Sequence, residues 1–203
     1  METREDDLLS LLREKVRGDV DSSARRRAEY STDASNYRIP PRVVVAPLDA
    51  ADVEAVLEVS RATKVPVTSR GAGTSCAGNA VGPGIVLDFS RYMNTIIEVD
   101  PQARTARVLP CVIMADLKKV AGQYGLRFGP DPSTQNRATF GGMIGNNACG
   151  PHAVAYGRTA DNVEELTAFL ADGPQLVAPP GSSHVAGLSE IVDENLAAIR
   201  TEM

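Results

Sequence analysis

Residues Arg70–Gly84 read RGAGTSCAGNAVGPG, with five glycines, one proline and a single large apolar side chain, Val81. A second stretch of the same kind, Gly141–Gly150, reads GGMIGNNACG. Glycine admits positive φ angles and lets another molecule approach the main chain, and consecutive free N–H groups form a concave anion site. A single loop of this kind is only a turn about as often as it is a binding site. Two of them, with Ser, Thr and Asn donors nearby, predict that the chain binds a polyanion.

The segments before the first loop predict an α/β unit that presents the loop at a sheet edge. Val43–Ala46 is a short apolar run that predicts a buried strand, and Asp49 or Asp52 can cap a helix that continues to about Thr63. Lys64–Thr68 (KVPVT) predicts the next strand, and the glycine-rich loop follows it. Ligands bind at the carboxyl ends of the strands in such sheets.

The other segments predict a chain of mixed α and β structure. Leu8, Leu12 and Val16 predict an N-terminal helix, whereas the polar stretch Asp19–Tyr37 has no clear assignment. A strand is expected at Ile85–Phe89, a hairpin at Thr95–Val99 with Thr105–Leu109, a helix at Ile113–Tyr124, a strand at Val163–Leu170 and a frayed helix at Asn195–Glu202. Gly129–Gly157 is glycine-rich and almost without periodicity, and so predicts a long loop with a functional role.

Composition excludes several classes of protein. The chain has 203 residues, 43% hydrophobic and 23% charged, which suffices for one sizeable core or two small ones. No apolar run approaches the roughly 20 residues of a membrane helix. The charged N-terminus, METREDDLL, does not resemble a signal peptide. A net charge of -5, with no basic cluster beyond Arg25–Arg27, argues against a nucleic-acid partner.

The cysteines and histidines argue against a metal site in this chain. Cys76, Cys111 and Cys149 are widely spaced, which disfavours a disulfide framework, an iron–sulfur site or a zinc site and fits a reducing cytoplasm. His152 and His184 are the only histidines, so a multi-histidine metal site cannot be built.

The first loop departs from the two common phosphate-binding patterns. Gly71 and Gly73 match the first glycines of Gly-x-Gly-x-x-Gly, but Cys76 takes the third position. In the P-loop pattern, Asn79 and Ala80 replace the lysine and the hydroxyl residue that binds Mg²⁺. The remaining interpretation is a pyrophosphate held by backbone and hydroxyl donors without a catalytic cation.

The second loop has the chemistry for a flat ring. Its neutral hydrogen-bonding side chains are Ser133, Thr134, Thr139, Asn146 and Asn147. Such groups along a stiff, glycine-lined slot suit a heteroaromatic ring with a polar edge. Taken singly, each hydroxyl is by default a side chain that stabilises a turn.

Together these residues resemble the FAD-linked oxidases and dehydrogenases of the vanillyl-alcohol oxidase type, which share the PCMH-type FAD-binding domain. The matching motifs run in the family's order: VTSRGAGTS (67–75), GPDPS (129–133), TFGG (139–142), NACG (147–150), GRTADNV (157–163) and LADG (170–173). Within the family, STDASNYR (31–38) and TADNVEEL (159–166) are similar to large bacterial proteins of the glycolate oxidase and D-lactate dehydrogenase-like subgroup, which carry a fused iron–sulfur half.

This resemblance implies an α+β fold of two small α/β subdomains with the cofactor between them. The implied domains are a helix and lead-in at 1–40, a first FAD-binding subdomain at 41–110 with its pyrophosphate loop at 70–75, a second subdomain at 111–173, and a truncated tail or linker at 174–203. The family's later flavin-closing strand and substrate cap are absent, so the chain is expected to be an N-terminal fragment of a longer protein.

The resemblance also implies the residues that bind FAD. Those expected around the pyrophosphate are Arg70, Gly71, Ala72, Gly73, Thr74, Ser75 and Gly78. Those expected along the ribityl chain and the flavin are Pro130, Ser133, Thr134, Thr139, Gly141, Gly142, Gly145, Asn146, Cys149 and Gly150, with Val163 near the adenine. Some relatives carry a tethering histidine where Thr74 stands, so FAD is expected to be non-covalent. Relatives usually have Pro-Gly at Pro110-Cys111, where the thiol adds bulk and is expected to be a small buried hydrophobe.

The implied activity is hydride transfer from a 2-hydroxy acid of the D-lactate or D-2-hydroxyglutarate class to the flavin, followed by electron transfer to a separate acceptor. An iron–sulfur cluster would belong only to the missing C-terminal part. No catalytic residue is assigned: His152 is the one candidate base, and its default interpretation is a hydrogen-bonded loop histidine. The expected location is the cytoplasm, with peripheral membrane attachment left open for the full-length protein. The alternatives are an isolated FAD-binding module without turnover and a non-redox nucleotide-binding domain.

Overall fold

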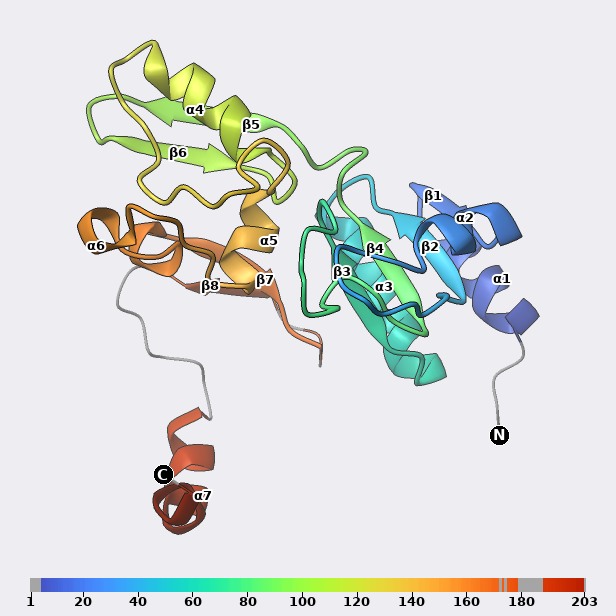
Figure 1. Ribbon diagram of the computed structural model, residues 1–203. Coiled ribbons are helices and arrows are strands. Elements are labelled where there is room, and N and C mark those ends of the chain that lie inside the picture. Colours follow the sequence, from blue (N-terminus) through green and yellow to red (C-terminus); the bar gives the residue numbers. More distant parts are fainter. Residues whose placement is uncertain (1–4, 172, 174, 179–187, 203) are drawn as a thin grey trace.

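The computed structural model describes residues 5–171, 173, 175–178 and 188–202, which form two packed units and a C-terminal helix (Figure 1). The first unit contains α1 (Glu5–Lys15), β1 (Asp19–Asp21), α2 (Ala24–Glu29), β2 (Val43–Ala46), α3 (Ala50–Thr63), β3 (Val67–Arg70) and β4 (Ile85–Asp88). The second contains β5 (Ile96–Asp100), β6 (Thr105–Val108), α4 (Met114–Gly122), α5 (Phe140–Gly145), α6 (Ala153–Tyr156), a 3-10 turn (Ala160–Asn162), β7 (Leu166–Phe169) and β8 (Gln175–Ala178). The helix α7 (Leu188–Glu202) follows.

A four-stranded sheet in the order β1-β2-β4-β3 organises the first unit. The strands β2 and β3 both pair in parallel with β4, and β1 pairs with β2 in the antiparallel sense. All residues of β2 and β4 are buried, as expected for strands covered on both faces. The predicted strand–helix–strand unit is confirmed. The parallel pairing of β3 places the glycine loop at the carboxyl edge of the sheet.

The helix α3 covers the sheet and fixes where β3 begins. The Asp49 side chain accepts the N–H groups of Ala51 and Asp52 and so caps the helix. The helix ends at Lys64, which has φ 58°. The prediction of a strand over Lys64–Thr68 was therefore wrong in its start, because a left-handed residue ends the helix and cannot open a strand; β3 spans Val67–Arg70.

The lead-in that precedes residue 41 belongs to the core of the first unit. Leu8 and Leu12 of α1 are fully buried in the same cluster as Val56 of α3. The polar stretch without a clear assignment forms β1 and α2, and β1 extends the sheet through the pair Val20↔Val45. Polar composition hid these short elements because their stability comes from tertiary pairing rather than from their own periodicity.

A buried carboxylate, Asp52, attaches the lead-in to α3. Its oxygens accept the backbone N–H groups of Arg17, Gly18 and Leu48 at 2.8–3.0 Å. Burial alone would raise the pKa of Asp52, but these hydrogen bonds and the Arg17 guanidinium outweigh burial and lower the pKa below its usual value.

We therefore expect Asp52→Asn to destabilise the chain by about 1–3 kcal/mol in urea unfolding at pH 7, because an amide cannot serve all three donors. A lowered folded-state pKa means that the stabilisation is present above the unfolded pKa of about 3.9 and is lost as the pH falls through the folded value. The difference between the two proteins should thus shrink at low pH. Asp100→Asn, at the exposed hairpin turn, is the control; a pH-independent difference would contradict this account.

The second unit has its own apolar cluster. Its buried members are Val112, Met114, Leu117, Ala138, Phe140 and Met143. The apolar side chains of the β5–β6 hairpin, Ile96, Val99 and Val108, pack against this cluster. The boundary at residue 110 stays a prediction, and this packing favours counting the hairpin with the second unit.

The stretch Gly129–Gly157 is not the loop without regular structure that was predicted, because it contains α5 and α6. These helices are too short for a periodic pattern to reveal, and three of the six residues of α5 are glycine. The predicted strand Val163–Leu170 is confirmed in part as β7, which pairs with the unpredicted β8. The predicted frayed helix forms the end of the longer α7.

Parts of the LADG motif and of the expected tail at 174–203 lie outside the described residues. Asp172 of the LADG motif lies outside them, as does the whole stretch 179–187 between β8 and α7. No helix within the described ranges combines the length and the apolar character needed to cross a membrane.

Candidate functional site

The first glycine loop, residues 71–80, presents a run of free amides directly after β3. Across the described part of the chain, no acceptor is recorded for the backbone N–H groups of residues 71–76. The loop turns through left-handed positions at Gly73 (φ 66°) and Gly78 (φ 78°). Consecutive free N–H groups around such a turn form an anion-binding concavity.

The loop touches the second unit at Thr139. A Cβ atom added to Gly71 would lie 2.2 Å from Thr139 Oγ1, so only glycine permits this approach. A second contact lies further along the loop, where Asn79 Nδ2 donates to Asn146 Oδ1 at 2.5 Å. The structure thus brings together the two glycine-rich stretches that the sequence separates.

A cavity of about 440 Å³ lies at this junction. It is lined by Ala72, Ser90, Asn94, Cys111, Ile113, Asp116, Arg137 and Thr139. Thr139 is 5% exposed, and its hydroxyl makes no hydrogen bond of ordinary distance and angle to the described residues, although it lies near enough to the Cys111 thiol to lower the pKa of that thiol slightly against the effect of burial. An unpaired buried hydroxyl costs about 1–3 kcal/mol, and this one lies at the wall of the cavity, against Gly71.

The side chain of Cys111 lines the cavity as a buried, uncharged thiol, as expected for a small buried hydrophobe. Burial, assisted by the nearby Asp88 carboxylate, raises the pKa of the Cys111 thiol to about 12. The residue is 3% exposed, whereas Cys76 and Cys149 are exposed and all three cysteines are free.

We expect brief treatment of the folded chain with iodoacetamide at pH 8 to add two adducts, at Cys76 and Cys149, because the thiolate is the nucleophile. Unfolding in urea should expose Cys111 and bring the count in the intact mass to three. Early alkylation of Cys111 in the folded chain would show that the thiol is neither buried nor protonated.

Thr159 and Asn147 hold the turn at the end of the second stretch. Thr159 is fully buried, and both its N–H (3.0 Å) and its hydroxyl (2.6 Å) donate to the Ala148 carbonyl. Asn147, at φ 44°, accepts the N–H of Ala160 with its side-chain oxygen. The TADN motif contained Thr159, but no feature of the sequence marked it as an anchor.

His152 is a hydrogen-bonded loop histidine, as its default interpretation predicted. Its ring atom Nδ1 lies 2.5 Å from Asp131 Oδ2, and its backbone N–H donates to Asp131 Oδ1. The bonds from His152 lower the pKa of Asp131. His152 is exposed and absent from the cavity lining, so no role as a base follows from its position.

The other residues predicted from the resemblance lie around the junction in different environments. Ala72 and Thr139 line the cavity, and Gly141 packs against Pro110. Pro130 is buried, while Ser133, Gly145, Asn146 and Cys149 are exposed, and Thr74, Ser75, Thr134, Gly142, Gly150 and Val163 are partly buried. Ser90, Asn94, Asp116 and Arg137 line the cavity without having been predicted, because no motif marks them.

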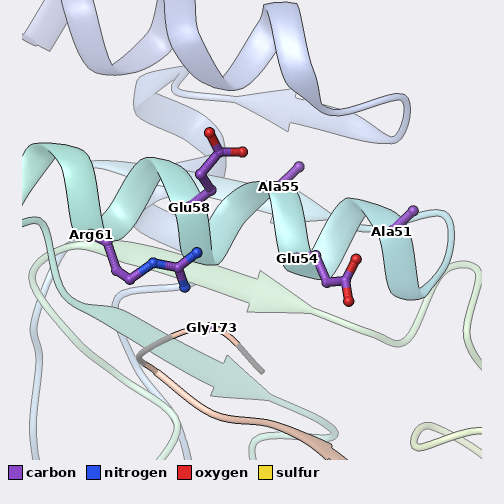
Figure 2. Close-up of a pocket in the computed structure, with 6 residues that line it drawn as sticks. All are labelled: Ala51, Glu54, Ala55, Glu58, Arg61 and Gly173. Carbon is purple, nitrogen blue, oxygen red and sulfur yellow. The ribbon is translucent and has the colours of Figure 1, made fainter. Parts of the chain in front are cut away.

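A second hollow, of about 450 Å³, lies on the outer face of α3 (Figure 2). Its lining includes Glu54, Glu58 and Arg61 of α3, together with Gly173. Arg61 Nη1 donates to the Ala171 carbonyl at 3.2 Å, which connects α3 to the turn after β7. Glu54 and Glu58 outnumber Arg61 in this wall, whereas Asp116 and Arg137 balance each other in the lining of the junction cavity. A polyanion is therefore better accommodated in the junction cavity, which is the candidate site. In the described ranges, no three side chains of His, Cys, Asp or Glu are placed to share a metal ion.

Comparison with known proteins identifies the family of this chain and several proteins of similar sequence. A family model described as "FAD binding domain" matches residues 41–178. The chain is 39% identical over 167 residues to D-2-hydroxyglutarate dehydrogenase of Pseudomonas putida, covering 81% of this chain and 17% of that protein. It is 36% identical over 155 residues to glycolate oxidase subunit GlcD of Bacillus subtilis, covering 75% of this chain and 33% of that protein. The chain thus spans only a minor part of these relatives.

Solved structures share the architecture. An alkyldihydroxyacetonephosphate synthase superposes with a TM-score of 0.77 at 17% identity, covering 94% of this chain and 37% of that one. The 6-hydroxy-D-nicotine oxidase of Arthrobacter nicotinovorans superposes with a TM-score of 0.73 at 24% identity, covering 83% of this chain and 37% of that one. At these identities the likeness shows the fold alone.

Proposed function

Because the chain belongs to the FAD binding domain family, we propose that the junction cavity holds FAD and that the chain is the flavin module of a 2-hydroxy-acid dehydrogenase. The predicted α+β fold of the PCMH type is confirmed by the structural neighbours. The residues that bind the cofactor and the substrate of the whole protein remain part of the proposal.

The first glycine loop fits the diphosphate of FAD. The N–H groups of residues 71–76 are available for phosphate oxygens, and no carboxylate of the loop itself opposes them. Backbone amides and the hydroxyls of Thr74 and Ser75 can bind a diphosphate without a lysine or a metal ion. Thr74 cannot form the covalent link that a histidine could, so the bound FAD is non-covalent in this proposal.

The second unit fits the ribityl chain and the ring. Thr139 supplies a buried hydroxyl, and the close contacts of Gly71 with Thr139 and of Gly141 with Pro110 leave no room for a side chain at either glycine. The bound flavin would supply the hydride-accepting chemistry. The residues of this chain would bind and orient it, and Cys111 and Ile113 would keep water from one side of the cavity.

The named activities of the relatives support the substrate class. They are D-2-hydroxyglutarate dehydrogenase, glycolate oxidase subunit and D-lactate dehydrogenase. All three names refer to a 2-hydroxy acid or its oxidation. We extend this class to the longer protein of which the chain would be the flavin-binding part, with electrons passing to a separate acceptor. The three free cysteines support a cytoplasmic location.

The observation that carries the proposal is that Ala72, from the loop whose N–H groups have no recorded acceptor, and Thr139, whose hydroxyl is buried and unpaired among the described residues, line the same cavity. Calorimetric titration of the purified chain with FAD tests it. We expect one FAD per chain, a shift of the flavin absorption band, and release of the flavin on acid precipitation. Flavin retained by the acid precipitate would contradict non-covalent binding.

Two further measurements separate the alternatives. Binding of ADP with no preference for FAD would favour a non-redox nucleotide-binding domain. In the longer protein, bleaching of the flavin absorption by D-2-hydroxyglutarate or D-lactate supports the dehydrogenase. Bound FAD that neither acid bleaches would leave only a cofactor-binding module.

A further inference from the structure

Residues 30–39, called the strap below, lie against the back of the first glycine loop and precede the family match, which begins at residue 41. The strap is a folded turn in its own right. Ile39 N–H donates to the Ser31 carbonyl at 2.8 Å, and Thr32 pairs with Arg38 as an isolated bridge. Asp33 Oδ1 accepts the N–H of Ser35 at 2.8 Å. The strap therefore offers preformed polar groups to the loop.

Two hydrogen bonds connect the strap with the two ends of the loop. The N–H of Ala34 donates to the Gly73 carbonyl at 3.0 Å. The N–H of Ala80 donates to Asp33 Oδ2 at 3.2 Å. The strap therefore binds a carbonyl of the loop, while the N–H groups of residues 71–76 have no recorded acceptor among the described residues.

Arg70 donates hydrogen bonds to both the strap and the loop. Its Nη1 donates to the Thr32 carbonyl at 2.9 Å and to the Ala80 carbonyl at 3.0 Å. The Tyr30 ring lies 5.0 Å from the guanidinium carbon. A Cβ at Gly73 would lie 2.7 Å from Arg70 Nη2, so the loop passes directly over the guanidinium. Two protein carbonyls thus accept hydrogen bonds from Nη1 of Arg70, a residue that the resemblance predicts to bind FAD.

Tyr30 and Asp88 are the next residues in contact around Arg70. The Tyr30 hydroxyl donates to Asp88 Oδ2, and Asp88 is paired with Arg70 in the register of β3 and β4. Asp88 is buried, and its second oxygen accepts the N–H of Ser90, a residue of the cavity lining. The strap, the sheet and the cavity wall are thereby connected through one set of hydrogen bonds.

We propose that Asp33 and Arg70 are positioning residues that hold the first glycine loop, through the strap, in the form that binds the diphosphate. This inference rests on the proposed function, since it assigns these residues to the FAD site. Neither residue needs to touch the cofactor. The competing account is that their charges act on the diphosphate directly, Arg70 by attraction and Asp33 by repulsion.

The two accounts predict opposite effects for Asp33→Ala. Loss of a negative charge near the loop would tighten binding of anionic FAD if charge alone mattered. Loss of the Ala80 and Ser35 contacts should weaken binding about tenfold if Asp33 positions the loop. Asp100→Ala is the matched control, because Asp100 caps the hairpin turn through the N–H groups of Gln102 and Ala103. We expect it to leave FAD affinity unchanged.

Arg70→Lys separates position from charge in the same way. Lysine keeps the positive charge but cannot reproduce the planar guanidinium between two carbonyls. We expect at least a tenfold loss of FAD affinity in calorimetric titration, together with faster proteolysis of the loop in the apo chain. Circular dichroism should remain that of the folded chain.

The outcomes divide as follows. Wild-type affinity in both Asp33→Ala and Arg70→Lys, or tighter binding by Asp33→Ala, overturns the positioning role while leaving the FAD site intact. No binding by the unsubstituted chain overturns the proposed function and this inference with it. Equal weakening by Asp100→Ala would show a general effect of stability and would also overturn the inference.

Discussion

Gly73→Val is expected to lower the affinity for FAD at least about 100-fold, which corresponds to about 2.7 kcal/mol. Gly73 has φ 66°, where a β-branched residue is a genuine outlier, and its new Cβ would lie 2.7 Å from Arg70 Nη2. Either the loop or the Arg70 guanidinium must move to relieve the close contact, and either movement disturbs the loop conformation that Arg70 holds through the Thr32 and Ala80 carbonyls. Calorimetric titration with FAD measures the loss.

The control for this substitution is Gly125→Val. Gly125 has φ 69°, almost the same conformation, but a Cβ there meets no heavy atom within 4 Å. Both variants carry a backbone penalty of about 1–2 kcal/mol in unfolding. Only Gly73→Val should lose FAD; equal affinities in the two variants would contradict the role of the loop.

Thr139→Val is expected to move stability and cofactor affinity in opposite directions. The Thr139 hydroxyl is buried and unpaired among the described residues, so an isosteric methyl should raise the unfolding free energy of the apo chain by about 1 kcal/mol. The same change removes a hydrogen-bonding group from the cavity, and FAD affinity should fall about tenfold or more. Thermal unfolding with and without FAD measures both effects.

Thr159→Val gives the matched comparison. Thr159 is also buried, but its hydroxyl donates to the Ala148 carbonyl, so its replacement should destabilise the apo chain by about 1 kcal/mol. Destabilisation of the apo chain by Thr139→Val would mean that its hydroxyl has a structural partner. If Thr139→Val bound FAD with unchanged affinity, the ribityl chain would not contact the Thr139 hydroxyl and would have to lie elsewhere.

Local patterns predicted the parts of the fold that local chemistry controls. The buried strand Val43–Ala46 and a helix capped by Asp49 or Asp52 were predictable because an apolar run and a helix cap each act over a few residues, and the structure selects Asp49 as the cap. The loop after β3 was predictable because its glycines are consecutive in the sequence. The start of β3 was not, since the left-handed Lys64 has no marker in its side chain.

The site was predictable only in its glycine-rich half. Thr139 was selected from a motif, but its unpaired hydroxyl depends on packing between two units. Asp88, Thr159 and Arg137 carry no local signal, because their significance arises from partners or neighbours that are distant in the chain. Arg70 was assigned to the cofactor, whereas the packing of its guanidinium against carbonyls of the strap and the loop could not be read from sequence.

The strand order also has a consequence for how the chain folds. The strand β4 is the last of the four to be synthesised, yet it lies between β2 and β3, each of which pairs with it. The β1–β2 pair can form without β4, but β3 can join the sheet only when the chain between residues 70 and 85 has turned back so that β3 and β4 lie side by side. Closure of a loop costs entropy that only the finished pairing recovers. We therefore expect the segment that we propose to bind the cofactor to affect the rate of folding as well, so that substitutions that distort it slow folding even when no flavin is present.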